Sequence, residues 1–230
     1  MKKTAALFDC DGTLFAAQYG RGLLKYASEH GRKGVTRAYF ASMLPLYLLR
    51  KIKLVSEEAY QRPLIARLAW MAKGMTEEEF RTASEWINKN YLLPRERTDV
   101  VARLREHQSK GHVVVLVSAQ LYPSLKTLGA HYNASGLVGT KVEMKNDRYT
   151  GQIIPPVITG ADKDRYTREY FSSNNMDIDW EASYAYADSI TDTGLFGLVG
   201  HPVAVYPDAR LLALAQNKNW EIIGTPKADS

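Results

Sequence analysis

The chain has a single cysteine and no long apolar run. Because Cys10 is the only thiol among 230 residues, no disulfide can form within the chain and core packing must hold the fold together. The longest nearly apolar runs, residues 43–49 and 113–117, are far shorter than the roughly 20 residues of a membrane-spanning helix. With 45% hydrophobic residues, we expect a sizeable core and no transmembrane segment.

Blocks of like charge are also missing, although the chain is basic overall. A net charge of +5 and a pI near 9.1 suit an anionic partner, but the 30 lysines and arginines are scattered among 25 acids. Zinc-finger spacing and aromatic-rich RNA motifs are absent, so we expect no nucleic-acid partner and prefer a small anionic substrate. The Met1-Lys2-Lys3 start is not typical of a signal peptide, which favours a cytoplasmic protein.

Short apolar runs alternate with helical stretches along most of the chain. The runs have strand length and cover residues 3–9, 112–118, 183–188 and 201–206. Helices are expected at about 95–110, where Gly111 supplies the stop, and at about 123–131. This alternation predicts an α/β fold, a Rossmann-like parallel sheet with helices on both faces.

The stretch between the first and second strands has a different pattern. Residues 17–94 show helical periodicity with hardly a strand signal, including a capping-box pattern at Thr76 and Glu79. We expect an inserted all-α cap domain there, with residues 1–16 and 95–230 forming the α/β core. Within the core, residues 140–153 form two alternating runs around Asn146-Asp147, which indicates a β-hairpin.

Four polar residues follow predicted strands or begin a predicted helix. Asp9, Ser118 and Asp188 each end a strand, and Lys163 should lie at the start of the helix after the hairpin. In open α/β sheets ligands bind outside the carboxyl ends of the strands, so these groups are expected to meet in one cleft. Because Cys10 stands between Asp9 and Asp11, either its thiol or a carboxylate could be the reactive group.

The motifs resemble those of a known enzyme superfamily. Asp9-Cys10-Asp11-Gly12-Thr13-Leu14 is similar to the first motif, D-x-D-G-[TS]-L, of the haloacid dehalogenase superfamily. Ser118, Lys163 and the segment Asp188-Ser189-Ile190-Thr191-Asp192 resemble its second, third and fourth motifs, in the family's order. The helical insertion after the first motif resembles the phosphoserine-phosphatase-like branch.

This resemblance implies a magnesium-dependent phosphatase that hydrolyses a small phosphate ester through an aspartyl-phosphate. Asp9 would be the nucleophile and a metal ligand, Asp11 the acid/base and, through its backbone carbonyl, a second ligand, and Asp188 a third. The phosphate would be bound by Ser118, Lys163 and the Gly12 amide, with Thr13 and Asp192 in supporting roles. A strand places Asp9 and Asp11 on one side and Cys10 on the other, so we interpret the thiol as apolar filler.

The substrate and two alternative functions stay open. Phosphoserine phosphatases carry a glutamate where this chain has Gln18, and a neutral amide cannot neutralise a serine ammonium. The apolar, basic stretch 43–54 suggests a lipid or lysolipid phosphate and peripheral membrane contact, although a core-facing cap helix explains it better. The alternatives are a non-catalytic phosphate-binding regulatory module on the same fold and, less favoured, a basic nucleic-acid-binding protein.

Overall fold

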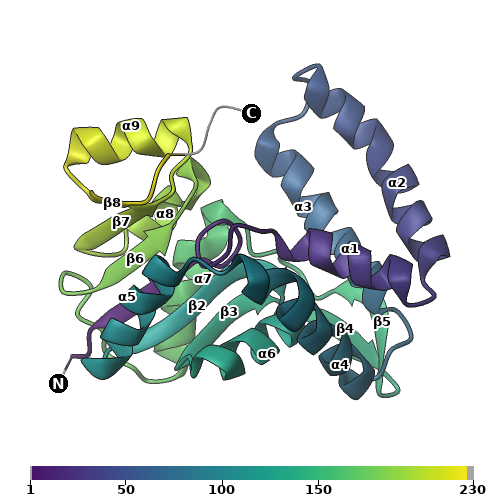
Figure 1. Cartoon of the computed structure of the whole chain (residues 1–230), viewed down its shortest axis with the longest axis horizontal. Helices are drawn as coiled ribbons and strands as arrows, with labels where there is room; N and C mark the ends of the chain where they lie inside the picture. The colour runs from purple at the N-terminus through teal and green to yellow at the C-terminus, as the bar shows by residue number, and fades with distance from the viewer. Residues whose placement is uncertain (1, 227–230) are drawn as a thin grey trace.

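A parallel six-stranded sheet with the order β3-β2-β1-β6-β7-β8 forms the centre of the computed structural model (Figure 1). The structure describes residues 2–226, apart from the side chains of Glu57, Glu58 and Ala161. The strands of this sheet are β1 Ala5–Phe8, β2 Val113–Leu121, β3 Gly136–Thr140, β6 Tyr184–Ala187, β7 His201–Val205 and β8 Glu221–Ile223. This sheet confirms the predicted α/β, Rossmann-like fold class.

Helices cover both faces of the sheet. The α-helices of the described residues are α1 Tyr19–Glu29, α2 Lys33–Lys51, α3 Glu57–Leu68, α4 Glu77–Ile87, α5 Thr98–Ser109, α6 Tyr122–Tyr132, α7 Gly160–Ser173, α8 Thr193–Phe196 and α9 Ala209–Lys218, of which α5 to α9 cover the sheet. Side chains of β1 alternate between two apolar clusters: Ala6 and Phe8 join the α5 and α6 side, whereas Ala5 and Leu7 join the α7, α8 and α9 side. Both faces of β1 are therefore buried, which explains its uninterrupted apolar sequence. None of the described helices is long and apolar enough to cross a membrane.

The edges of the sheet were not predicted. Strands β3 and β8 were missed because β3 contains two glycines and β8 has only three residues. Strand β2 also continues past Ser118 to Leu121, through a register irregularity between Val117 and Leu121 in its pairing with β3. Ser118 is consequently an interior strand residue at a bulge and not the strand terminus that we expected.

The order of the strands changes direction at β1. The chain passes from β1 outward through β2 to β3 and then returns to β6 on the other side of β1. Phe8 pairs with Tyr186 and their rings stack 4.3 Å apart, so β1 and β6 end side by side. Such a reversal leaves a crevice at the carboxyl ends of the strands, and Asp9 and Asp188 are the residues that follow them.

Four helices, α1 to α4, stand between β1 and α5 in sequence, as expected for the insertion. The capping box of α4 is formed, with Thr76 Oγ1 accepting from the Glu79 amide and the Glu79 carboxylate accepting from the Thr76 amide. Helix α4 packs on α6 of the core, whereas α2 and α3 extend away as a helical hairpin (Figure 1). The division of the chain into a core and a cap at residues 17–94 stays a prediction.

The expected β-hairpin is confirmed as β4, Val142–Lys145, paired antiparallel with β5, Arg148–Ile153. Its two turn residues, Asn146 and Asp147, both have positive φ, the conformation that a two-residue hairpin turn favours. The hairpin joins the inserted helices because Tyr149 exchanges backbone hydrogen bonds with Gly74 and Met75. This contact fixes one end of the insertion against the core.

Candidate active site

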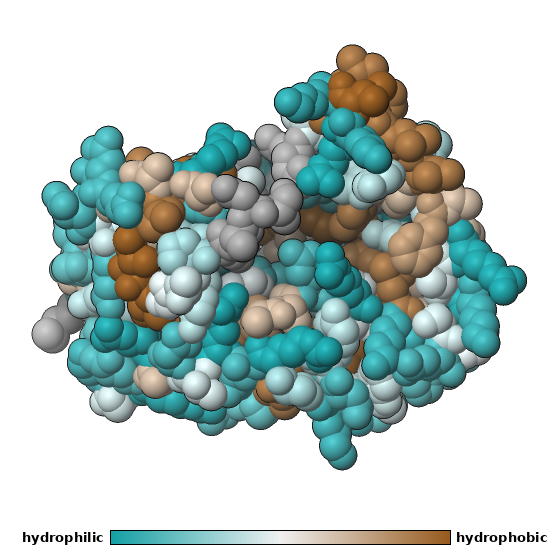
Figure 2. Space-filling view, turned by 45° about the horizontal axis from the view of Figure 1, so that its top comes forward, coloured by the Kyte–Doolittle hydropathy of each residue, from teal (hydrophilic) through white to brown (hydrophobic). Residues whose placement is uncertain are grey.

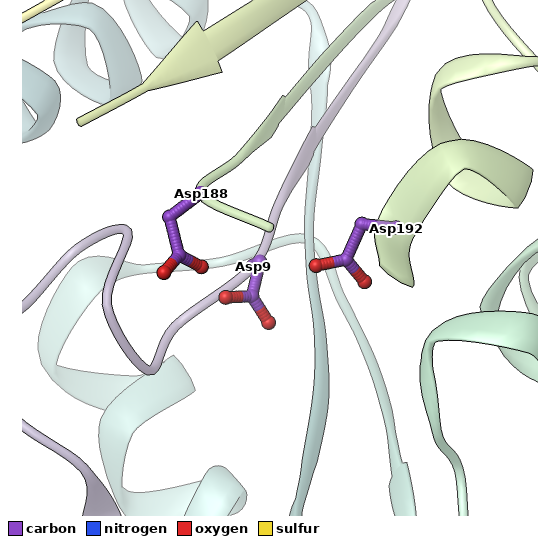
Figure 3. Close-up of side chains that lie close together, drawn as sticks. All are labelled: Asp9, Asp188 and Asp192. Atoms are coloured by element: carbon purple, nitrogen blue, oxygen red, sulfur yellow. The ribbon is translucent and has the colours of Figure 1, made fainter. Parts of the chain in front are cut away.

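Three aspartates from two distant segments converge at the carboxyl end of β1 (Figure 3). One oxygen from each of Asp9, Asp188 and Asp192 lies within 4.8 Å of the other two, and all three residues are buried. Asp9 follows β1, Asp188 follows β6, and Asp192 ends the 3-10 turn Ile190–Asp192. The parallel pairing of β1 with β6 is therefore what brings the first and fourth motifs together.

Lys163 inserts its ammonium between two of these carboxylates. Its Nζ lies 2.6 Å from Oδ1 of Asp9 and 2.7 Å from Oδ1 of Asp192, and the side chain is 5% exposed. Burial lowers the pKa of Lys163, but the facing carboxylates of Asp192 and Asp9 outweigh this and raise the pKa above its ordinary value. Lys163 lies in the first turn of α7, as predicted, and its role toward Asp192 is an ion pair.

The turn after Asp9 is shaped by Gly12 and Thr13. Gly12 has φ +89°, and a Cβ at this position would collide with the Asp188 carboxylate, so only glycine fits. Its amide donates to the carbonyl oxygens of Phe15 and Ala17, at 2.9 and 3.2 Å, and therefore stabilises the turn. The phosphate contact that we expected for this amide stays a prediction, because in this structure the amide donates within its own turn.

Thr13 lies between the two carboxylates nearest the turn. Its Oγ1 is 3.1 Å from Oδ2 of Asp9 and 3.2 Å from Oδ1 of Asp188. One hydroxyl proton can serve only one of these oxygens at a time, so the contact holds the two carboxylates close together. The supporting role predicted for Thr13 therefore has a definite contact.

Asp11 follows Asp9 in the turn and is held by two donors. Its Oδ1 accepts from the Tyr19 amide at 3.1 Å and from Nε2 of Gln120 at 2.7 Å. Burial, followed by the charge of Asp9, raises the pKa of Asp11 from 3.8 to about 7, although the two hydrogen bonds oppose the shift. Because both of these donors bind Oδ1, the other oxygen, Oδ2, is the natural place for a proton.

Ser118 lies within β2 and Cys10 follows β1, and their side chains interact. Ser118 is 1% exposed and its Oγ accepts from the Gln120 amide at 3.2 Å. Cys10 packs in the same apolar cluster as Ala6 and Phe8, and burial raises the pKa of its thiol well above the ordinary value. The neutral, buried thiol agrees with our interpretation of Cys10 as apolar filler.

The aspartate cluster suits a divalent cation bound through oxygen. When all groups are ionised, the three carboxylates and the Lys163 ammonium together carry a net negative charge in a buried place. Burial raises the pKa of Asp192, and the attraction of Lys163 only partly offsets this rise. The raised pKa is what an excess of negative charge in the cluster predicts. Carboxylate oxygens are the ligands that Mg²⁺ prefers, so the residues present fit the predicted metal.

Sequence reasoning missed two interactions at this site. Gln120 was not singled out, although it lies two residues after Ser118 and its backbone amide donates to the Ser118 hydroxyl. Arg62 of α3 was also missed: its Nη2 lies 2.7 Å from Oδ2 of Asp162, next to Lys163, and so connects the insertion to α7. Among the cap arginines, sequence position alone could not single out Arg62 because the pairing depends on how α3 meets α7.

Comparisons with known proteins agree with this geometry. The family model described as haloacid dehalogenase-like hydrolase matches residues 6–196. Phosphoserine phosphatase SerB1 of Mycobacterium tuberculosis is 28% identical over 227 residues, which cover 95% of this chain and 70% of that protein.

Solved structures show the same fold. A protein with unknown function from Bordetella pertussis Tohama I has a TM-score of 0.81 and 21% identity, covering 97% of this chain and 99% of that chain. A phospho-aspartyl intermediate analogue of phosphoserine phosphatase has a TM-score of 0.63 and 18% identity, covering 100% and 96%. The family model spans most of the chain, and the four motifs meet at the carboxyl end of the sheet. The chain therefore belongs to the haloacid dehalogenase-like hydrolases.

Proposed function

We propose that this hydrolase is a magnesium-dependent phosphatase that cleaves a phosphate monoester through an aspartyl-phosphate on Asp9. The observation that supports this most strongly is the buried group of Asp9, Asp188, Asp192 and Lys163 beside an acid, Asp11, whose pKa is about 7. In this proposal the nucleophile, the cation site and the proton donor lie next to one another at the carboxyl end of β1. The phospho-aspartyl analogue named for the structural neighbour supports the same chemistry.

In this proposal Asp9 attacks phosphorus while its neighbours neutralise charge. A phosphate ester and an attacking carboxylate repel each other, so the site must supply positive charge before they can approach. Lys163 supplies one such charge from the Oδ1 side of Asp9, and Ser118 can donate its hydroxyl proton to a phosphate oxygen. Mg²⁺ held by Asp9, Asp188 and the Asp11 carbonyl would neutralise the remaining phosphate charge.

Asp11 would carry the proton in both halves of the reaction. Protonated on Oδ2, it donates to the leaving alkoxide, and the resulting carboxylate then accepts a proton from the water that attacks the aspartyl-phosphate. A pKa of about 7 lets the group exist in both forms near neutral pH. Gln120 and the Tyr19 amide would orient the carboxyl group by holding Oδ1.

Position 18 argues against phosphoserine as the substrate. Gln18 directly precedes Tyr19, whose amide binds Asp11, so residue 18 lies where the insertion enters the site. A glutamate there could pair with a substrate ammonium, but the neutral amide of Gln18 cannot. We therefore propose a phosphate ester whose alcohol carries no ammonium at that place, in contrast to the substrate named for SerB1.

The test measures phosphate release from a panel of esters with Mg²⁺ and with EDTA. The panel contains phosphoserine, a sugar phosphate, glycerol phosphate and a lysolipid phosphate. We expect Mg²⁺-dependent turnover that Asp9→Asn abolishes, and poor turnover of phosphoserine. Equal phosphate release by wild type and Asp9→Asn would contradict the mechanism, and no turnover of any ester together with tight phosphate binding would favour a regulatory module.

A second measurement isolates the covalent step. p-Nitrophenyl phosphate has a leaving group that needs no protonation, so Asp11→Asn should still form the aspartyl-phosphate but should hydrolyse it slowly. We expect acid-quench mass spectrometry to find phosphate on the peptide that contains Asp9 in Asp11→Asn. Asp9→Asn is the matched control, and the same adduct in that variant would contradict Asp9 as the nucleophile.

A further inference from the structure

The outward side of the α2–α3 hairpin carries large apolar side chains that are exposed to solvent over about half or more of their surface. We call this set the apolar tip: Phe40, Leu44, Tyr47, Leu48, Ile52 and Leu54. Hydrophobic colour follows α2 along this edge of the molecule in Figure 2. Leu54 and Ile52, which are 71% and 63% exposed, are the most exposed of the large apolar residues that the structure describes.

The exposure follows from how α2 is oriented. The inward face of α2 carries Thr36, Tyr39 and Met43, which are buried. The predicted core-facing helix therefore faces the core only along this stripe. Phe40, Leu44 and Leu48 recur every four residues on another face and therefore form a continuous stripe. Such a stripe on a protein surface marks an interaction site more often than it occurs by chance.

The same segment is strongly basic. Residues 30–56 contain no aspartate or glutamate but six lysines and arginines, at positions 32, 33, 37, 50, 51 and 53. Two glutamates follow at 57 and 58, which still leaves the hairpin cationic. Most of the chain's net charge of +5 can thus be traced to this one protruding element.

Apolar and basic side chains interleave at the end of the hairpin. Lys51, Ile52, Lys53 and Leu54 alternate in sequence, and Lys53 adopts a left-handed conformation at φ 59°. The Leu54 amide donates to the Leu49 carbonyl at 2.9 Å, which fixes the turn and presents both apolar side chains outward. Lysine ammoniums flanking exposed apolar side chains are typical of elements that lie in a membrane interface, because the stems extend along the apolar layer while the charges reach the headgroups.

We propose that the apolar tip binds the surface of an anionic lipid bilayer. Phe40, Leu44, Leu48, Ile52 and Leu54 enter the boundary between headgroups and acyl chains, while the neighbouring lysines contact lipid phosphates. A second copy of the chain is a poorer partner, because an apolar contact between two tips would bring two cationic segments together. The proposal concerns a surface outside the catalytic crevice and does not depend on the phosphatase assignment.

The test is co-sedimentation of the full chain with vesicles of phosphatidylcholine, with and without phosphatidylglycerol. We expect binding to the vesicles that contain phosphatidylglycerol, weakened by high ionic strength and much weaker without the anionic lipid. Lys51→Ala/Lys53→Ala should lower the partition coefficient about 25-fold, from roughly fivefold per charge. Ile52→Ser/Leu54→Ser should lower it by at least about tenfold through lost apolar burial.

Matched controls separate the surface from general charge effects. Lys89→Ala/Lys218→Ala removes two exposed lysines elsewhere and should bind the vesicles like wild type. All variants should melt like wild type, because the substituted side chains are exposed. No binding to anionic vesicles, or equal binding by the tip variants, would overturn the proposal; so would self-association of wild type that Ile52→Ser/Leu54→Ser abolishes without any vesicle binding.

Discussion

Replacing Asp11 by asparagine removes a carboxyl group whose proton affinity differs between the folded and unfolded chain. In the fold, burial and the charge of Asp9 raise the pKa from 3.8 to about 7. Below pH 3.8 the carboxyl group is protonated in both the folded and the unfolded chain, so its ionisation does not affect the stability of the wild type. As the pH rises toward 7 the unfolded chain releases this proton first, and the folded wild type therefore loses stability, a loss that the neutral asparagine of the variant does not share.

The size of the effect follows from the same values. Each pH unit between them is worth about 1.4 kcal/mol, so the whole interval corresponds to at most about 4 kcal/mol. Asp11 is partly exposed to solvent, which screens its charge, so we expect about 2 kcal/mol. Asp11→Asn should thus gain stability relative to wild type as the pH rises.

Urea unfolding of both proteins in EDTA, from about pH 4 to about pH 8, measures this difference directly. Asp147→Asn at the exposed hairpin turn also removes one carboxylate and serves as the matched control, with a curve parallel to wild type. Parallel curves for wild type and Asp11→Asn would refute the reasoning. They would mean that Asp11 is solvated like a surface acid and unsuited to donate a proton near neutral pH.

Three further substitutions test the packing of the site. Gly12→Ala should collide with Asp188 and strain the positive φ, lowering urea stability by at least about 1 kcal/mol and turnover by more than about tenfold. Lys163→Met should leave Asp9 and Asp192 without their shared ion pair and cost about 3 kcal/mol in EDTA, part of which Mg²⁺ restores in a thermal melt. Cys10→Ala should keep turnover within about twofold of wild type in the ester assay while costing about 1 kcal/mol.

Local chemistry was enough to predict the elements on which the site is built. Asp9 follows an apolar run, Asp188 follows another, and Lys163 follows a hairpin whose Asn146-Asp147 turn requires two left-handed residues. Each of these signals depends on side-chain burial or backbone conformation within a few residues, which a sequence displays directly. For the same reason the edge strands β3 and β8 escaped prediction, since short strands that contain glycine or lie at an edge lack the apolar run.

By itself the sequence determined the α/β class, the order of the four motifs and the alternation that puts Asp9 and Cys10 on opposite sides of a strand. Only the tertiary structure decided which of these groups meet. The pairing of Lys163 with Asp192, the contact of Gln120 with Asp11 and the use of the Gly12 amide inside its own turn each depend on the packing of segments or the closing of a loop. The exposure of Ile52 and Leu54 was decided in the same way, because a sequence does not show which of its apolar residues the fold buries and which it leaves exposed.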